Sequence, residues 1–384
     1  NNNININNKK IRKKELKMKF IIKKDVLLEN LNHTSKAISS RNLIPILTGI
    51  KFELKEEGLY LFASDTDISI KSFIPVSNIV EVMELGSVVI GGKYIVELIR
   101  KLPDSDISIE VLDDYKMLIS TDKIEFNLNG INPNEYPNLD MEKSDEPIII
   151  DTNVFKEIIN QTFFATSQNE SRPLLTGINF KLSNNCLDVI ATDSYRLAKK
   201  HIELDVNIDE EVNIVIPGKN VLELSRILGE EEDKLEMHIF NNKILFVYNN
   251  IMFLSRLLSG TYPANSSIIP TEYDISVSCN YNDLYNMIDR ASLLEKNTIK
   301  MELGNNELKI SSNSPEIGYV EEKMDVECEK ELDISFSAKY MSEAIRSFNK
   351  EIITLYFISD SSPIVIKCEE DNSLIQLVLP IKTY

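Results

Sequence analysis

The sequence predicts an α+β fold made of three homologous domains, each with two helices packed on antiparallel sheet. Three observations lead to this prediction. Short segments of alternating apolar and polar residues are separated by polar turns, as in antiparallel strands. Between them lie amphipathic segments with helical periodicity. Several motifs also recur at nearly fixed offsets along the 384 residues.

The recurrence of motifs is the strongest of these observations. Leu47–Phe52 (LTGIKF) returns 128 residues later as Leu175–Phe180 (LTGINF). At the same offset, Ala63–Asp65 (ASD) returns as Ala191–Asp193 (ATD). A repeat of this length is too long for a solenoid and indicates a duplicated domain.

A third copy is fainter and is carried by a K-x-x-x-E-x-x-R motif. The motif spans 93–100, 219–226 and 339–346, and each copy follows a strand-like run. The sequence therefore predicts domains at 18–141, 142–270 and 271–384. Residues 1–17 are rich in asparagine, then basic, and we expect a disordered extension there.

The elements of the first domain follow from its pattern in order. Residues 19–23 alternate as a strand, and Asp25 is expected to cap the helix that follows. The matching helices are expected near 153–166, capped by Asn153, and near 282–294. After the first helix, residues 50–54, 59–63 and 68–73 alternate as short strands.

The motif segment of each domain is expected to form an amphipathic helix. In the first copy, one apolar stripe should consist of Tyr94, Ile95, Leu98, Ile99 and Leu102. Lys93, Glu97 and Arg100 lie at i, i+4 and i+7, on the other face. For a single copy, the simplest interpretation is a solvated helix with weak ion pairs.

Recurrence of the cations at one register favours a further role. The basic positions on or beside these helices are Lys93, Arg100, Lys101, Lys219, Arg226, Lys339 and Arg346. The chain as a whole carries a net charge of −18, so these helices locally reverse the sign. Cations without base-reading side chains suit a phosphate backbone bound without sequence preference. Bulk acidity opposes binding DNA from outside and is compatible with enclosing it.

Composition excludes several other classes of protein. No apolar run approaches the roughly 18–20 residues that span a bilayer, so no membrane association is expected. The four cysteines are far apart, which favours a reducing cytosol. Only three histidines occur, and they are scattered, so we expect no metal, no cofactor and no catalytic triad.

From about residue 18 onward, the chain resembles the bacterial DNA polymerase III beta subunit, the replicative sliding clamp. The resemblance is carried by Met18–Phe20 (MKF), Leu43–Leu47 (LIPIL), Tyr136–Leu139 (YPNL), Ala191–Leu197 (ATDSYRL) and Leu377–Ile381 (LVLPI), together with the threefold repeat. It implies a head-to-tail homodimeric ring that encircles double-stranded DNA and tethers the polymerase, without catalysis of its own. It also implies a cytoplasmic, nucleoid-associated protein.

The resemblance further implies an apolar pocket between the second and third domains. There, short linear motifs of the DNA polymerase III alpha subunit, the clamp loader and repair polymerases would bind. The corresponding positions are Arg172, Leu174, Leu175, Thr192, Arg196, Leu197, Pro263, Ile268, Val378, Leu379, Pro380 and Ile381. Ser194-Tyr195 replaces the Gly-His of many members, and Ser267 replaces a basic residue of some, so the peptide preference stays open.

The same resemblance assigns DNA and dimer contacts. Arg41, Lys93 and Lys219 match DNA-contacting cations, and Asn169 lies in a loop that could contact phosphate. For the dimer, Leu293 and Leu294 of one copy are expected against Phe126 of the other. For each of these apolar residues, an ordinary place in a core is the alternative.

Two rival functions remain at this point. A catalytic or metal site could be suspected at Asp65, Asp67 and Asp193, but Asp67 has no counterpart in the other domains and these residues suit turns better. No glycine-rich phosphate loop and no H-E-x-x-H motif is present. The second rival is a clamp paralogue or a non-replicative repeat scaffold that binds partner peptides.

Overall fold

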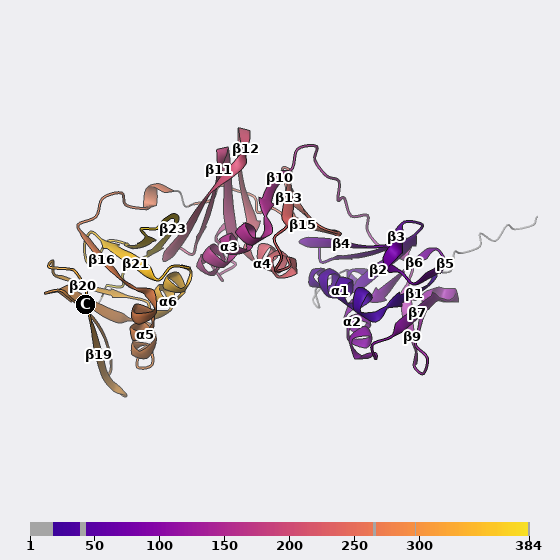
Figure 1. The fold of residues 1–384 in the computed structure, drawn as a ribbon, viewed down its shortest axis with the longest axis horizontal. Helices are drawn as coiled ribbons and strands as arrows, with labels where there is room; N and C mark the ends of the chain where they lie inside the picture. The colour runs from indigo at the N-terminus through magenta and orange to yellow at the C-terminus, as the bar shows by residue number, and fades with distance from the viewer. Residues whose placement is uncertain (1–17, 39–43, 264–265, 296, 383–384) are drawn as a thin grey trace, which may run out of the picture. The chain divides into compact units, whose positions relative to one another are not determined.

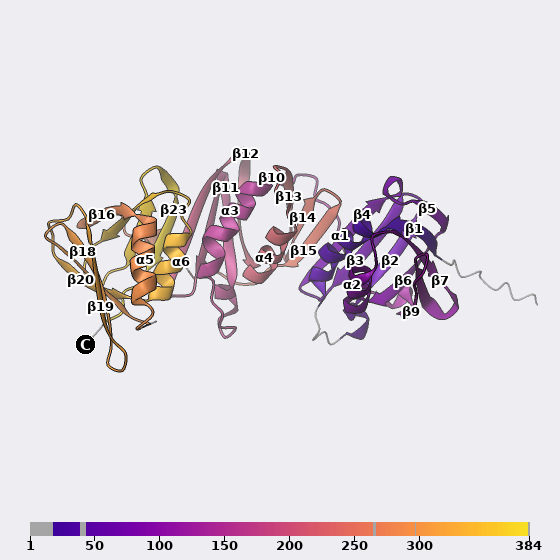
Figure 2. The ribbon, with the colours of Figure 1, turned by 60° about the horizontal axis from the view of Figure 1, so that its bottom comes forward.

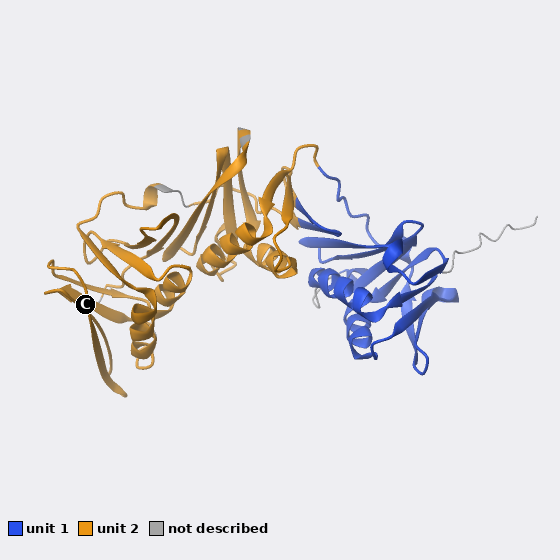
Figure 3. Cartoon of the chain, viewed as in Figure 1, with its two compact units in different colours: residues 1–143, 245–254 blue, residues 144–244, 255–384 orange. Residues whose placement is uncertain are grey.

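The computed structural model describes residues 18–38, 44–263, 266–295 and 297–382. These residues form two compact units, which Figure 3 colours separately. Unit 1 holds residues up to 143 together with 245–254, and unit 2 holds 144–244 and 255–384. The predicted extension 1–17 lies outside the described residues.

The first predicted domain alternates helices with antiparallel strands, labelled in Figure 1. Its elements are β1 (Lys19–Lys23), α1 (Lys24–Thr34), β2 (Gly49–Lys55), β3 (Gly58–Ser64), β4 (Ile68–Pro75), β5 (Glu81–Glu84), β6 (Gly86–Gly91), α2 (Gly92–Lys101), β7 (Asp106–Val111), β8 (Lys116–Ser120) and β9 (Glu125–Ile131). The strand order is β4-β3-β2-β6-β9-β8-β7-β1-β5. The strands predicted at 19–23, 50–54, 59–63 and 68–73 are confirmed.

The second and third predicted domains also place two helices among antiparallel strands, with fewer strands between the helices. The second contains β10 (Ile148–Asp151), α3 (Thr152–Thr162), β11 (Gly177–Thr192), β12 (Arg196–Pro217), α4 (Gly218–Ile227), β13 (Lys234–Ile239), β14 (Lys243–Tyr248) and β15 (Ile251–Arg256). The third contains β16 (Ile275–Asn280), α5 (Tyr281–Ala291), β17 (Ile299–Gly304), β18 (Glu307–Ser314), β19 (Gly318–Asp325), β20 (Leu332–Phe336), α6 (Ala338–Arg346), β21 (Ile352–Phe357), β22 (Ile364–Cys368) and β23 (Asp371–Val378).

The helices contact each other in pairs, α1 with α2, α3 with α4 and α5 with α6. Figure 2 shows α5 and α6 side by side. The predicted motif helices are therefore confirmed as α2, α4 and α6. No helix within the described part of the chain is both long and apolar enough to span a bilayer.

Two predicted helix caps are wrong. α1 already begins at Lys24, which places Asp25 inside the first turn. The carboxylate of Asp25 accepts from the adjacent Val26 N–H. α3 starts at Thr152, with Asp151 rather than Asn153 at the N-cap. Capping signals two residues apart are hard to separate from sequence, because an acidic or polar residue also suits the first turn.

The apolar stripe of α2 is displaced from the predicted one. Its buried residues are Gly92, Ile95, Val96 and Ile99, whereas Tyr94 is 74% exposed. The prediction for Tyr94 is therefore wrong. Tyrosine suits a stripe as well as a surface, so hydrophobicity alone placed it in the core.

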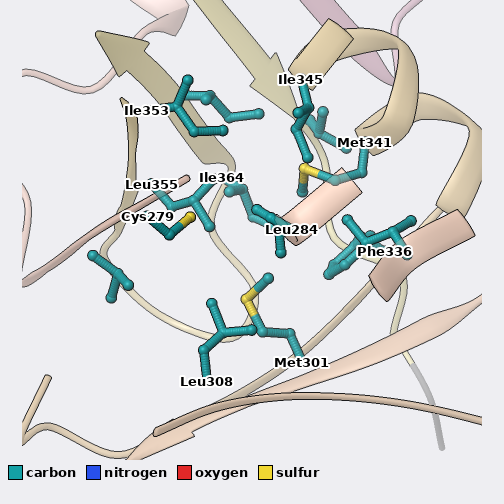
Figure 4. Close-up of a cluster of buried hydrophobic side chains, with 14 of the residues drawn as sticks. Cys279, Leu284, Met301, Leu308, Phe336, Met341, Ile345, Ile353, Leu355 and Ile364 are labelled. Carbon is teal, nitrogen blue, oxygen red and sulfur yellow. The ribbon is translucent and has the colours of Figure 1, made fainter. Parts of the chain in front are cut away.

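The third domain is built on one buried cluster, drawn in Figure 4. Leu284 of α5 and Met341 and Ile345 of α6 pack there against strand residues such as Phe336 and Leu355. These side chains are fully buried, at 0% exposure. The helices thus bury one face on the sheet and leave the opposite face to solvent.

Within unit 2, a single sheet joins the second and third domains. Its strand order is β11-β12-β23-β22-β21-β16. Arg196–Lys200 of β12 pairs antiparallel with Leu374–Val378 of β23. Buried amides reinforce the junction, since Gln376 Nε2 donates to Gln161 O at 2.9 Å and Gln161 Nε2 donates to Ser347 O at 3.1 Å.

Candidate binding surfaces

The recurrent cations lie on the exposed faces of their helices. Lys93, Arg100, Lys101, Lys219, Arg226, Lys339 and Arg346 are all exposed. The buried faces of α2, α4 and α6 hold the apolar residues. These cations therefore lie on solvent-facing surfaces of the helices rather than in the core.

In α2 and α4, the arginine of the motif pairs with the glutamate one turn earlier. Arg100 Nη1 donates to Glu97, and Arg226 Nη1 donates to Glu223 at 2.5 Å. The arginine side chains are about half exposed, at 51% and 55%. Such exposed pairs contribute only a few tenths of a kcal/mol and lower the net charge of the face.

In α6, the same positions have different partners. Glu343 accepts from Nη1 of Arg196, a residue of β12. The guanidinium of Arg346 instead lies over the ring of Tyr285 in α5, 5.6 Å from its centroid. The third copy of the motif therefore connects two predicted domains of unit 2.

Two other predicted DNA-contacting residues lie in loops. Asn169 is exposed, and its Oδ1 accepts from the N–H of Ser171 at 2.9 Å. That bond shapes the loop and leaves the amide nitrogen available. Arg41 lies outside the described residues.

The predicted pocket residues surround a second apolar cluster in unit 2, separate from the core of Figure 4. The cluster contains Leu175, Ile190, Leu197, Val215, Tyr262, Ile269, Val365 and Leu377, with Leu174, Leu258, Tyr273, Tyr356, Ile375 and Leu379 partly buried against it. A row of directly paired residues crosses the sheet: Leu197 to Leu377, Leu377 to Val365 and Val365 to Tyr356. One face of the sheet is thus apolar across four strands.

The turn between β11 and β12 forms one side of this region. Ser194 has a φ of 79°, and the carboxylate of Asp193 accepts from the N–H groups of Tyr195 (2.9 Å) and Arg196 (3.1 Å). Thr192 Oγ1 donates to Arg196 O at 2.5 Å. This hydrogen bonding fits the turn role expected for Asp193 and leaves Tyr195 62% exposed at the rim.

Arg196 is a buried anchor between domains. The residue is 6% exposed, and its Nε donates to Asp193 Oδ2 at 3.0 Å while Nη1 reaches Glu343. Its guanidinium lies 4.4 Å from the ring centroid of Tyr340. Arg196 therefore supports the pocket region from beneath and presents little surface to a ligand.

The chain after β23 lies beside the turn. Leu379 N donates to Tyr195 O at 2.9 Å, and Ile381 N donates to Ser335 O at 2.7 Å. Leu379, Pro380 and Ile381 are half-buried. Their partial exposure is compatible with the predicted wall of a peptide pocket.

Val378 occupies a different place from the other C-terminal residues. It is fully buried in the third-domain core with Met341 and Ile345. Because side chains alternate along a strand, the neighbouring Leu377 faces the second cluster instead. The sequence prediction chose Val378 from this pair and missed Leu377.

The remaining predicted pocket residues divide into rim and floor. Arg172, Pro263 and Ile268 are exposed, and Arg172 Nη1 donates to Ser194 Oγ at 3.3 Å. Leu174 is half-buried and Leu175 is buried. The structure brings the rim and the floor to one region of unit 2.

Sequence reasoning missed Tyr262 as part of this floor. Tyr262 is 7% exposed, its hydroxyl oxygen accepts from Thr192 N at 3.1 Å, and burial raises its pKa well above the usual range. The echo of Tyr136-Pro137 in Tyr262-Pro263 was the available signal. Both tyrosines are buried at the corresponding place, Tyr136 beside Leu47.

Exposed apolar residues lie at the positions predicted for the dimer contact. Phe126 on β9 is 43% exposed, and Leu293, just after α5, is 74% exposed, whereas Leu294 is half-buried. From Glu125 to Asn129, β9 pairs with β8. In the third domain, β19 pairs with β18 and lies at the edge of its sheet.

Within the described residues, no cluster of three or more histidine, cysteine or acidic side chains could hold a metal ion. Cys279, Cys328 and Cys368 are buried as free thiols. Burial, together with the nearby charge of Asp283, raises the pKa of the Cys279 thiol to about 12. This thiol suits packing rather than nucleophilic chemistry.

Comparisons with known proteins cover nearly the whole chain. The DNA polymerase III beta subunit family matches at residues 18–140 (N-terminal domain), 149–264 (central domain) and 266–382 (C-terminal domain). The beta sliding clamp of Staphylococcus aureus is 40% identical over 377 residues, covering 96% of this chain and 100% of that protein. A crystal structure of the DNA polymerase sliding clamp from Bacillus subtilis is 41% identical, with a TM-score of 0.92, and covers 96% of this chain and 100% of its own.

Proposed function

Because the chain belongs to the DNA polymerase III beta subunit family, we propose that it works as a sliding clamp whose exposed motif helices face duplex DNA. It is a non-catalytic subunit that provides processivity. The observation that carries the DNA-facing assignment is the exposed cation pair of the motif, repeated on α2, α4 and α6 in a chain of net charge −18.

In this proposal, weak binding is sufficient because the ring holds DNA by enclosure. The cations align the backbone without reading bases, and two of the three motif arginines are partly neutralised by glutamate. The affinity for DNA that the ring does not enclose should therefore be low and sensitive to salt. The site of action would be the bacterial nucleoid in the cytoplasm.

A loading experiment tests this function. The protein is incubated with a matched clamp loader and ATP on primed circular DNA, and bound protein is measured after gel filtration in high salt. We expect retention on circles and loss after a restriction enzyme linearises them. A protein that never stays on the circle would be a clamp paralogue or a repeat scaffold instead.

The ring itself would form from two copies joined head to tail. Exposed Phe126 on β9 and exposed Leu293 after α5 would supply the apolar part of each contact, and the edge strand β19 would supply backbone groups. Analytical ultracentrifugation at micromolar concentration should show a dimer. Replacing Leu293 with Asp should produce monomers, whereas the same change at exposed Ile352 on β21 should not.

The apolar region around Leu197 and Leu377 is proposed to bind short motifs of the DNA polymerase III alpha subunit, the clamp loader and repair polymerases. A pocket with an apolar floor and a few polar groups at its rim suits the hydrophobic tail of such a peptide. Tyr195, Arg172 and Ile268 would form the rim, which sets the preference among peptides.

A labelled polymerase-tail peptide tests the pocket by fluorescence anisotropy. Deleting Leu379–Tyr384 should abolish binding while the dimer persists. Leu379→Ser should weaken binding about tenfold, because it removes one apolar wall. The matched control is Ile352→Ser, an exposed apolar residue on β21. Unchanged peptide affinity in both pocket variants would exclude this site.

A further inference from the structure

The first domain contains a cavity at a place where the second domain has different side chains. The cavity has a volume of about 510 Å³ and lies between α2 and the turn that follows α1. Its lining includes Ser35, Thr48, Lys93, Tyr94, Glu97 and Arg100. The volume falls within the roughly 300–1,000 Å³ typical of sites for small ligands.

The lining of the cavity combines the aromatic ring of Tyr94 with two cations, Lys93 and Arg100. Tyr94 is 74% exposed, although it belongs to a helix whose other apolar residues are mostly buried. Lys93 is exposed beside it. Arg100 is held in place by Glu97 and by Asn32 Oδ1, at 3.3 Å. An aromatic face next to positive charge is the combination that proteins use for single-stranded nucleic acid.

The second domain fills the corresponding place. After α1 the turn begins with Ser35, and after α3 the equivalent turn begins with Phe163. A Cβ at Gly218 would come within 3.2 Å of the Phe163 ring, so this ring packs on the start of α4. In the position of Tyr94 stands Asn220, which is 9% exposed and donates to Ser255 Oγ at 2.8 Å.

At the start of α2, Gly92 faces the aliphatic side chain of Ile38, whereas Gly218 at the start of α4 faces the ring of Phe163. A Cβ at Gly92 would meet Cδ1 of Ile38 rather than a ring. The first domain therefore has a serine where the second has phenylalanine, and an exposed tyrosine where the second has a buried asparagine. Both differences open the same cavity.

We propose that this cavity binds one unpaired nucleotide of single-stranded DNA. The base would stack on Tyr94, and the adjoining phosphate would lie near Lys93 and Arg100. The bases of a duplex are paired and stacked inside the helix, so they cannot enter this cavity. An unpaired base of a single strand can rotate away from its neighbours and enter it. The assignment deepens the proposed function, because it rests on α2 facing DNA.

The test uses the full-length protein and a fluorescein-labelled oligothymidylate of about six nucleotides, within the range that such sites cover. Anisotropy is measured at about 50 mM salt, where phosphate contacts are strongest. Tyr94→Ala should weaken binding about tenfold, and Tyr94→Phe should retain it. Lys93→Ala should lower the slope of log affinity against log salt by about 0.7.

A double variant transplants the second domain's arrangement. Ser35→Phe with Ile38→Thr should fill the cavity and lower the affinity for the oligonucleotide as much as Tyr94→Ala does. The control is Tyr319→Ala, which removes a tyrosine that is 60% exposed in the third domain and should leave affinity unchanged.

Three results would overturn the proposal. They are undetectable oligonucleotide binding, equal affinity of the wild type and Tyr94→Ala, and displacement of the oligonucleotide by the polymerase-tail peptide, which would place it in the partner pocket. Retention on circular DNA is scored separately for Tyr94→Ala. Loss of oligonucleotide binding with retention intact supports the cavity, whereas a wild-type protein that fails on circles refutes the clamp function itself.

Discussion

The glutamate of the K-x-x-x-E-x-x-R motif has one kind of partner in α2 and α4 and another in α6. Glu97 and Glu223 pair with arginines of their own helices, in solvent. Glu343 pairs with Arg196, whose side chain is only 7% exposed and which belongs to another predicted domain. The motif thus forms a solvated surface in α2 and α4, whereas in α6 it links two predicted domains.

The difference shows that a repeated motif can be conserved within a chain for different physical reasons. A cationic face requires only that the lysine and arginine remain exposed. The link to Arg196 requires that Glu343 meet a buried charge, and losing such a partner is much more costly than losing an exposed pair. Substitutions along the motif should therefore have unequal effects.

Arg196→Met should have the largest effect. It leaves Asp193, 11% exposed, without its cation and removes the packing against Tyr340, so we expect a loss of about 3–5 kcal/mol in unfolding free energy. Urea unfolding followed by circular dichroism and tyrosine fluorescence measures it, since the chain has no tryptophan. A loss below about 0.5 kcal/mol would show that the anchor contributes nothing.

Glu343→Ala should come next, compared with Glu97→Ala. The first variant removes one of two carboxylates from Arg196, and we expect a loss of about 1–2 kcal/mol, reduced because Glu343 itself is 37% exposed. The second should lose less than about 0.5 kcal/mol. Equal losses in the same urea assay would erase the difference between the helices.

Arg226→Ala should barely change stability and should change DNA binding instead. We expect unfolding free energy within about 0.5 kcal/mol of wild type, because its pair with Glu223 is exposed. The slope of log affinity for duplex DNA against log salt should fall by about 0.9 if one phosphate contact is lost. An unchanged slope would argue against α4 facing DNA.

Asp371→Asn should have the smallest effect, confined to acid. Burial raises the pKa of Asp371, but hydrogen bonds from Ser373 and the charge of Lys200 outweigh burial and lower it overall. Because the pKa is lower in the folded state, the ionised carboxylate stabilises that state above about pH 4. This stabilisation is lost as the pH falls through the folded-state pKa. The unfolding free energy of the variant should therefore fall less steeply than that of wild type as the pH drops below about 4. Identical acid profiles would contradict this role.

The architecture was largely predictable because it depends on local periodicity and on repetition. Alternation in 50–54 and helical spacing in 93–102 both report burial directly. The capping errors at Asp25 and Asn153 are shifts of two residues from the observed N-caps, Lys23 and Asp151. Tyr94 could not be assigned from periodicity, because a tyrosine suits an exposed cavity lining as well as an apolar stripe.

The candidate pocket was predictable in location but not in detail. The resemblance brought Leu175, Leu197 and Leu379 to one region, as the structure does. It could not decide between Leu377 and Val378, since strand register sets which side chain faces which cluster. Nor could it show that Arg196 is a buried anchor, because its partner Glu343 lies 147 residues away in the sequence.

The pairing of β12 with β23 also bears on how the protein is made. Arg196 lies opposite Val378, roughly 180 residues later in the chain. At about 5–20 residues per second, the ribosome needs roughly 10–40 s to produce the second strand after the first. Throughout that interval the nascent chain carries an open edge on β12, which is the kind of edge that recruits chaperones or another copy of the chain.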